Sequence, residues 1–153
     1  MELTLVGIGT GNPDHLTLQA IEAIRAADIL LIPEKGEGKQ ELADLRRTIV
    51  AGCVEDDGVR VLSFAMPERD PAVPDYKTQV KLWHDAIAQA WVDALAPYPE
   101  ARKIVLLVWG DPALFDSTLR VAERIRKACP LELKVVPGLT SLQVLAASHA
   151  IPL

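Results

Sequence analysis

A chain of 153 residues with 50% hydrophobic content is long enough to bury one substantial core, so a single domain is expected. Its net charge of -5 argues against nucleic acid as a partner, because nucleic-acid binders gather Lys and Arg on one face. No apolar run approaches the ~20 residues of a membrane span, which argues against a membrane partner.

Strands and helices alternate along the first half of the chain. Apolar runs that read as strands cover residues 3–8, 28–32 and 59–64. Between them, helical periodicity covers residues 13–26 and residues 41–51, the latter with Leu42, Leu45 and Ile49 on one face. Three prolines then predict an irregular, extended connection.

The second half continues the alternation. Residues 76–96 form the longest predicted helix, in which Trp83 and Trp91 are interpreted as core residues. Residues 104–109 are apolar throughout, which is typical of a central parallel strand covered on both faces. Asp111 can cap a helix that begins at Pro112 and runs to about residue 128. A fifth strand over residues 131–136 precedes a last helix from Thr140 or Ser141.

This order predicts an α/β fold: an open, mostly parallel five-stranded sheet with helices on both faces. In such sheets the ligand lies beyond the carboxyl ends of the strands. Three segments with unusual chemistry should meet at that edge, namely residues 7–13, 109–116 and 136–143.

Each of the three segments has more than one interpretation. The glycines of the first segment let the backbone approach a ligand closely, and a tight turn before a helix is the alternative explanation. A dinucleotide-binding loop fits poorly, because the third glycine comes one residue early and Glu34 lies too late. Asp111 can hold a cationic ligand or only cap a helix, and Thr140 with Ser141 can form an ordinary helix start.

The order and spacing of four motifs resemble the tetrapyrrole methylase family across nearly the whole chain. The motifs read VGIGTGNPDHLTLQAIEAI, ILLIPEKGEGKQEL, VWGDPALFDSTLRV and VVPGLTSLQVLAA. Within the family, PEKGEGKQELADLRR and GDPALFDSTLR look most like the precorrin-6A synthase branch. The resemblance implies a two-domain S-adenosylmethionine-dependent methyltransferase that methylates a precorrin carbon in cobalamin biosynthesis, with loss of acetate. Residues 1–153 would be its N-terminal domain, and the second domain, which completes the cofactor cleft, is absent from this chain.

Two sets of site residues follow from the resemblance. The residues expected to face the cofactor, S-adenosylmethionine, are Thr10, Trp109, Gly110, Asp111, Thr140 and Ser141. The residues expected to meet the tetrapyrrole substrate are Gly7, Gly9, Gly11, Glu34, Lys35, Lys39 and Arg46. Many relatives have proline where Thr10 stands, so the contact of Thr10 with the cofactor departs from the pattern of those relatives. The basic residues Lys35, Lys39, Arg46 and Arg47 have an alternative interpretation as a solvated charged face.

No catalytic residue and no metal are assigned. A sulfonium carries its own activation, and the three histidines show no ligand spacing. Cys53 and Cys129 fit no metal or redox motif and indicate free thiols, hence a cytoplasmic protein.

Two other functions stay open at this point. One is a different methyltransferase of the same fold, acting on ribosomal RNA or a diphthine precursor; the acidic charge weighs against RNA. The other is a non-catalytic binding or dimerisation module that kept only this half of the fold. An apolar edge left exposed should favour self-association, so we expect a homodimer.

Overall fold

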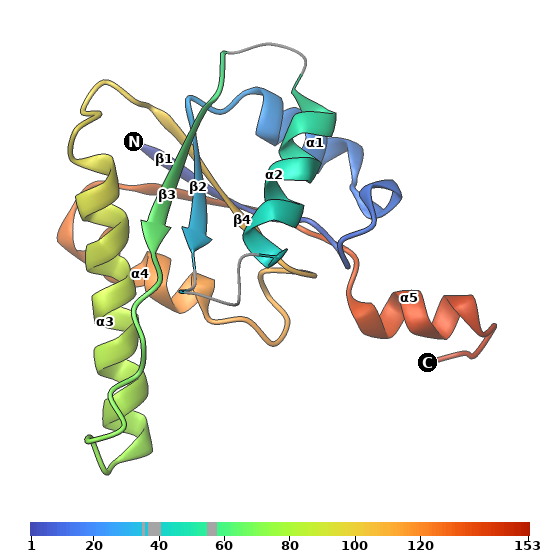
Figure 1. Cartoon of the computed structure of the whole chain (residues 1–153). Coiled ribbons are helices and arrows are strands. Elements are labelled where there is room, and N and C mark those ends of the chain that lie inside the picture. Colours follow the sequence, from blue (N-terminus) through green and yellow to red (C-terminus); the bar gives the residue numbers. More distant parts are fainter. Residues whose placement is uncertain (35, 37–40, 55–57) are drawn as a thin grey trace.

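The computed structural model describes residues 1–34, 36, 41–54 and 58–153 of the chain. Five parallel strands form one sheet in the order β3-β2-β4-β1-β5 (Figure 1). The strands are β1 (Glu2–Gly7), β2 (Ile29–Glu34), β3 (Arg60–Ala65), β4 (Lys103–Val108) and β5 (Glu132–Val136). The predicted five-stranded α/β fold is confirmed.

Helices cover both faces of the sheet. The covering helices are α1 (Leu18–Arg25), α2 (Glu41–Cys53), α3 (Tyr76–Leu95) and α4 (Thr118–Ala128), and a further helix, α5 (Ser141–Ser148), follows β5. One core cluster joins the sheet to α1 and α2, and a second joins the other face to α3 and α4. Within the described ranges, no helix combines the length and the hydrophobicity that a membrane crossing requires.

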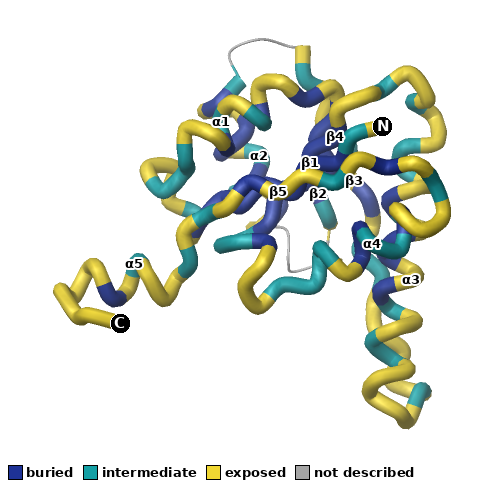
Figure 2. Tube along the Cα trace, turned by 180° about the vertical axis from the view of Figure 1, so that it is seen from behind, coloured by how far each residue is buried: buried dark blue, intermediate teal, exposed yellow. Residues whose placement is uncertain are grey.

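The centre of the core is β4, which pairs with β1 on one side and β2 on the other. Every residue from Ile104 to Val108 is at most 4% exposed. Figure 2 shows the same distribution, with buried segments in the sheet and exposed segments around it. The prediction of a central strand covered on both faces is therefore correct.

Two helices begin later than the sequence suggested. Pro13–His15 form a 3-10 turn, and α1 itself begins at Leu18, after the N-cap Thr17, whose hydroxyl accepts a hydrogen bond from an amide of the first turn. The helix expected from Pro112 begins at Thr118, after a loop in which Phe115 has a left-handed backbone (φ 55°). The prediction that Asp111 caps this helix is wrong.

The buried face of α2 also differs from the predicted one. Leu42 is 46% exposed, whereas Arg46 is 8% exposed and lies on the buried stripe. Arg46 shares this stripe with Ala43 and Ile49, at spacings of three residues that keep them on one side of the helix. The sequence prediction placed Leu42 on the buried face because leucine is apolar. The helix is instead oriented so that Arg46 is buried and Leu42 is exposed.

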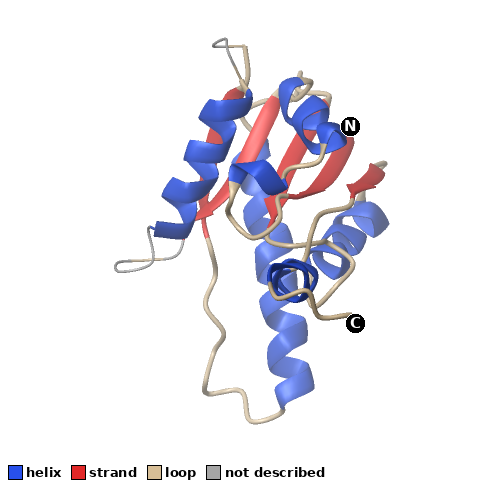
Figure 3. Cartoon of the chain, turned by 90° about the vertical axis from the view of Figure 1, so that its right-hand side faces the viewer, coloured by secondary structure: helices blue, strands red, loops and turns tan. Residues whose placement is uncertain are grey.

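Two segments extend away from the sheet. The connection after β3 runs along the first half of α3 (Figures 1 and 3), where the Trp83 indole donates to the Pro67 carbonyl at 2.7 Å. Trp91 is core, and Trp83 packs against the core from a half-buried position. At the other side, α5 projects from the end of β5 with mostly exposed residues (Figures 1 and 2).

Candidate functional site

Three glycines bring the ends of β1, β4 and β5 into main-chain contact. A methyl group added at Gly138 would lie 2.1 Å from the Gly110 carbonyl oxygen and 2.8 Å from Gly7 Cα. One added at Gly7 would lie 2.6 Å from the Gly138 nitrogen. Gly7 and Gly138 leave no room for a side chain, and Gly110 has a left-handed backbone (φ 65°) that favours glycine. We call these three residues the glycine junction.

Hydrogen bonds fix the loops around the glycine junction. Gly110 donates its amide to the Gly9 carbonyl at 2.8 Å, and Gly9 donates back at 3.4 Å. The Asp111 carboxylate accepts from the Gly138 amide at 2.9 Å and from the Ala113 amide at 2.8 Å. Asp111 therefore ties the loop after β4 to the loop after β5, which is a different role from helix capping.

The start of α5 lies beside the same junction. A methyl group on Gly110 would meet Thr140 Cα at 3.9 Å, so the two segments are within van der Waals distance. The Thr140 hydroxyl and the Gln143 side chain form a capping box that fixes the first turn of α5. Ser141 follows as the first helical residue and is exposed.

The loop after β1 has a buried and an exposed part. Gly7 and Gly9 are buried at the junction, whereas Thr10 is exposed and Gly11 half-buried. The Thr10 hydroxyl lies 2.8 Å from His15 Nδ1, in a hydrogen bond that holds the tip of the loop. Of the first loop, Thr10 and Gly11 are thus the more accessible to a ligand.

Trp109 and Arg46 lie under this loop. The Arg46 guanidinium is 4.8 Å from the centre of the Trp109 ring, and a methyl group on Gly11 would meet that ring at 3.5 Å. Arg46 Nε donates to the Leu107 carbonyl at 3.4 Å and Nη1 to the Leu42 carbonyl at 3.3 Å. Burial lowers the pKa of Arg46 to about 10, although the charge of Asp116 opposes this change.

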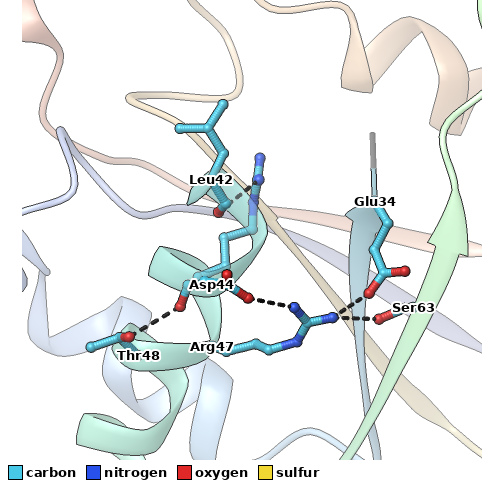
Figure 4. Close-up of polar contacts among 7 residues, drawn as sticks. Glu34, Leu42, Asp44, Arg47, Thr48 and Ser63 are labelled. Carbon is cyan, nitrogen blue, oxygen red and sulfur yellow. Dashed lines mark hydrogen bonds and ion pairs between the residues drawn. The ribbon is translucent and has the colours of Figure 1, made fainter. Parts of the chain in front are cut away.

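Glu34 belongs to a separate polar cluster at the ends of β2 and β3. Its carboxylate accepts from Arg47, which also contacts Asp44 at 2.9 Å and Ser63 at 3.0 Å (Figure 4). The Ser63 hydroxyl and the Arg47 guanidinium lower the pKa of Glu34. Glu34 is therefore an ionised partner of Arg47. The other two predicted substrate residues of this region, Lys35 and Lys39, lie outside the described residues.

A cavity of about 210 Å³ opens at the same sheet edge, between α2, α3 and the start of α4. Arg46 and Trp109 line it on the α2 side, and Phe64, Met66 and Trp83 line it on the α3 side. The start of α4 completes it with Asp116, Ser117 and Thr118. The cavity therefore combines one buried cation with mostly apolar walls.

Asp116 and Ser117 are functional candidates that the sequence analysis missed. The Asp116 carboxylate accepts from the Thr118 amide at 2.6 Å, and Ser117 is the N-cap residue of α4. The sequence Asp-Ser-Thr is itself a helix-start signal. Asp111-Pro112 is a second helix-start signal earlier in the same segment, but α4 begins at Thr118, after Asp116-Ser117.

Comparison with known proteins identifies the family of this chain. The model of the Tetrapyrrole (Corrin/Porphyrin) Methylases matches residues 2–153. The chain belongs to the tetrapyrrole methylase family. The resemblance inferred from the four motifs is thereby confirmed, and the glycine junction lies within the matched region.

Curated members of the tetrapyrrole methylase family align along nearly the whole chain. A precorrin-6A synthase [deacetylating] from Sinorhizobium sp is 44% identical over 99% of this chain and 59% of the relative. A cobalt-precorrin-2 C(20)-methyltransferase from Salmonella typhimurium is 31% identical over 99% of this chain and 58% of the relative. The chain thus spans a little under three fifths of the length of these two relatives.

Solved structures agree with the sheet and its helices. A cobalamin synthesis related protein from Corynebacterium diphtheriae superposes with a TM-score of 0.75 at 34% identity, over 99% of this chain and 59% of that one. A uroporphyrin-III-C-methyltransferase from Thermus thermophilus gives a TM-score of 0.60 at 21% identity, over 99% of this chain and 53% of that one; this supports the fold alone.

Proposed function

We propose that this chain supplies the N-terminal part of an S-adenosylmethionine-dependent methyltransferase that acts on a precorrin and releases acetate, the reaction of a deacetylating precorrin-6A synthase. The 44% identical relative bears that name. The observation that carries the proposal is the glycine junction, which holds three strand-end loops at one rim of the sheet. In an open parallel sheet, that rim is where ligands bind.

The residues at this rim fit S-adenosylmethionine. Gly110 has a left-handed backbone (φ 65°) and is half-exposed, so main-chain groups beside it are open to a ligand. The acidic group at the junction is Asp111, and an acid is suited to a positively charged ligand. The bound cofactor would supply an electrophilic methyl group on a sulfonium. Main-chain atoms of Gly110 and Thr140, with the side chains of Asp111 and Ser141, would hold it.

The protein's contribution to the reaction is positioning. Rigid loops that fix a methyl group in line with a ring carbon convert a bimolecular step into an intramolecular one, an effect that can contribute up to about 7 to 11 kcal/mol. The paired Gly9 and Gly110 amides and the double acceptor Asp111 provide such rigidity here. Trp109 supports the first loop, because its ring packs between Gly11 and Arg46.

The tetrapyrrole substrate carries carboxylate groups around an apolar ring, so its site should combine apolar walls with cations. We place this site along the exposed part of the first loop and the adjoining basic side chains, with Arg46 as its buried cation. Glu34 contributes through Arg47, whose guanidinium it orients. Lys35 and Lys39, outside the described residues, are the further cations that we expect to take part in substrate binding.

A second domain would form the opposite wall of the cofactor cleft. The two curated relatives described above have about two fifths of their length outside the matched region. The 153-residue chain should therefore methylate poorly or not at all by itself. Assay of the whole Sinorhizobium relative beside its matched N-terminal part tests this, because equal turnover by both would contradict a two-domain cleft.

Self-association and location complete the proposal. Leu142 and Leu145 of α5 are 56% and 60% exposed, and we expect them to be covered in a homodimer. Sedimentation of a Leu142→Glu/Leu145→Glu variant should show a monomer where the unmodified chain shows a dimer; two identical profiles would argue against this interface.

The proposed location is the cytoplasm. Cys53 and Cys129 are both free thiols, which suits this reducing compartment.

Isothermal titration with S-adenosylmethionine tests the cofactor site. A Gly110→Trp variant should lose binding, because the bulky side chain fills the space beside Thr140. Gly58→Trp is the matched control, since no neighbour among the described residues lies within 4 Å of a methyl group added there. Unchanged affinity in a folded Gly110→Trp variant would remove the junction from the cofactor site.

A further inference from the structure

Arg46 is a buried cation without a carboxylate partner among the described residues. It is 8% exposed, and no carboxylate in those ranges lies within ion-pair distance of its guanidinium. Its described hydrogen bonds are long, at 3.3 and 3.4 Å, and both go to main-chain carbonyls. Asp116, which lines the same cavity, acts on Arg46 only from beyond ion-pair distance, so the buried charge is incompletely compensated within the described chain. A ligand anion in contact with the guanidinium would supply the missing part.

The same cavity receives the start of α4. This helix has 11 residues, and Ser117 at its N-cap makes no side-chain capping hydrogen bond. The Thr118 amide is taken by Asp116, and the positive end of the helix dipole faces the cavity beside Ser117. A helix start and a buried guanidinium are two independent features that favour an anion in one place.

The other walls limit the size and character of the ligand. Phe64, Met66, Trp83 and Ile87 present apolar surface, which suits a short aliphatic segment. The cavity of about 210 Å³ has room for a ligand somewhat larger than benzene, which fits a cavity of ~150 Å³, and a propionate group lies within that limit. Asp116 is the one acid that lines it within the described chain, and its Oδ1 is already bound to the Thr118 amide.

We propose that this cavity binds the carboxylate of a short aliphatic acid between Arg46 and the start of α4. In keeping with the proposed function, on which this choice of source rests, the carboxylate belongs to an acetate or propionate arm of the tetrapyrrole. The cavity then selects the substrate by the length of that arm. A free short-chain acid has the same chemistry, and the experiment below separates the two sources.

Thermal unfolding of the chain in sodium acetate or propionate, against sodium chloride at equal ionic strength, measures binding directly. For a Kd of about 5 mM, ~100 mM acetate should raise the Tm by about 4 to 7 °C. The three tryptophans of the chain all line the cavity, so intrinsic fluorescence should change along the same titration. An equal Tm in acetate and chloride would overturn the proposal.

Two variants connect the effect to this cavity. Arg46→Met keeps an unbranched apolar stem but removes the charged guanidinium, and it should abolish the acetate effect. Ser117→Asp places a tethered carboxylate at the start of α4 and should abolish the effect even if Arg46→Met fails to fold. Arg126→Met removes a solvent-exposed charge near the other end of α4 and should retain the full effect. A full acetate effect in folded Arg46→Met or in Ser117→Asp would refute the assignment.

Uroporphyrin, which carries acetate and propionate arms, distinguishes the two sources. If an arm is the ligand, uroporphyrin should compete with acetate, and its affinity should fall about tenfold in Arg46→Met, the loss expected for one charged hydrogen-bonding partner. Binding of free acetate without such competition would overturn the arm as the source. Titration of S-adenosylmethionine into Arg46→Met keeps the two proposals separate, because unchanged cofactor affinity preserves the methyltransferase assignment whatever acetate does.

Discussion

Gly138→Ala tests the glycine junction at its tightest point. The added methyl group would lie 2.1 Å from the Gly110 carbonyl oxygen and 2.8 Å from Gly7 Cα, and both obstacles are main chain. Gly138 does not have a left-handed backbone, so the alanine is opposed by this contact and not by its own φ angle. The strand-end loops must separate to admit it.

The expected loss is at the upper end of the range for overpacking. Additional methylene groups in a packed region cost typically 1–3 kcal/mol, and main chain gives way less readily than a side chain. We therefore expect a free energy of unfolding lower by about 3 kcal/mol and a Tm lower by about 6 to 12 °C. Because Asp111 accepts from the Gly138 amide, cofactor affinity should fall with stability.

Urea and thermal denaturation followed by circular dichroism provide the measurement. Gly52→Ala is the matched control, because Gly52 lies in α2 and no described neighbour outside the helix backbone is within 4 Å of the added methyl group. That variant should be more stable than the unmodified chain by roughly 0.5–1 kcal/mol, since alanine favours helix. If Gly138→Ala lay within about 0.5 kcal/mol of the unmodified chain, a range typical of surface substitutions, the close approach at the junction would be wrong.

Three further substitutions probe the polar contacts. Asp111→Asn keeps one acceptor oxygen for two amides and should lower the free energy of unfolding in urea by about 1–2 kcal/mol; full stability would contradict the link to Gly138. Thr140→Ala removes the capping box and should cost about 1 kcal/mol, detected as faster hydrogen exchange in α5; unchanged exchange would contradict it. Two amides at the start of β4 lower the pKa of Asp28, so its contribution to stability is present above its unfolded pKa of about 3.9 and disappears as pH falls through the lower folded value. Asp28→Asn should weaken this acid dependence in urea titrations from about pH 5 to 2, and an identical pH profile would argue against it.

Strong periodic signals made most of the fold predictable. The strand over residues 104–109 was placed correctly because an unbroken apolar run fits only a position covered on both faces. The convergence of the loops at Gly7, Gly110 and Gly138 follows from parallel topology, since the carboxyl ends of parallel strands share one edge. Both the central strand and the shared sheet edge follow from patterns that extend over many residues, so an error at one residue does not change the prediction.

The errors concern residues whose role depends on a partner far along the chain. Asp111 had a local explanation as a helix cap, but its carboxylate accepts from Gly138, 27 residues later. For Arg46 the structure contradicts only the alternative of a solvated face, because its burial depends on how α2 is rotated against β4 and Trp109. The conformational preference of a single residue does not reveal such tertiary contacts. The three-residue spacing of Arg46 from Ala43 and Ile49 could nevertheless have indicated that Arg46 lies on the buried face of α2.

The two parts of the site differ in how fully their polar groups are satisfied. Asp111 has both carboxylate oxygens hydrogen-bonded to main-chain amides, and a fully satisfied network of this kind makes loops rigid. Arg46 has long contacts to carbonyls and no described ion pair, so part of its bonding capacity is available to a ligand. Substitutions at the junction should therefore lower stability and cofactor affinity together. Substitutions at Arg46 should change carboxylate affinity while cofactor affinity stays constant, and a parallel loss of both would mean that the two parts act as one site.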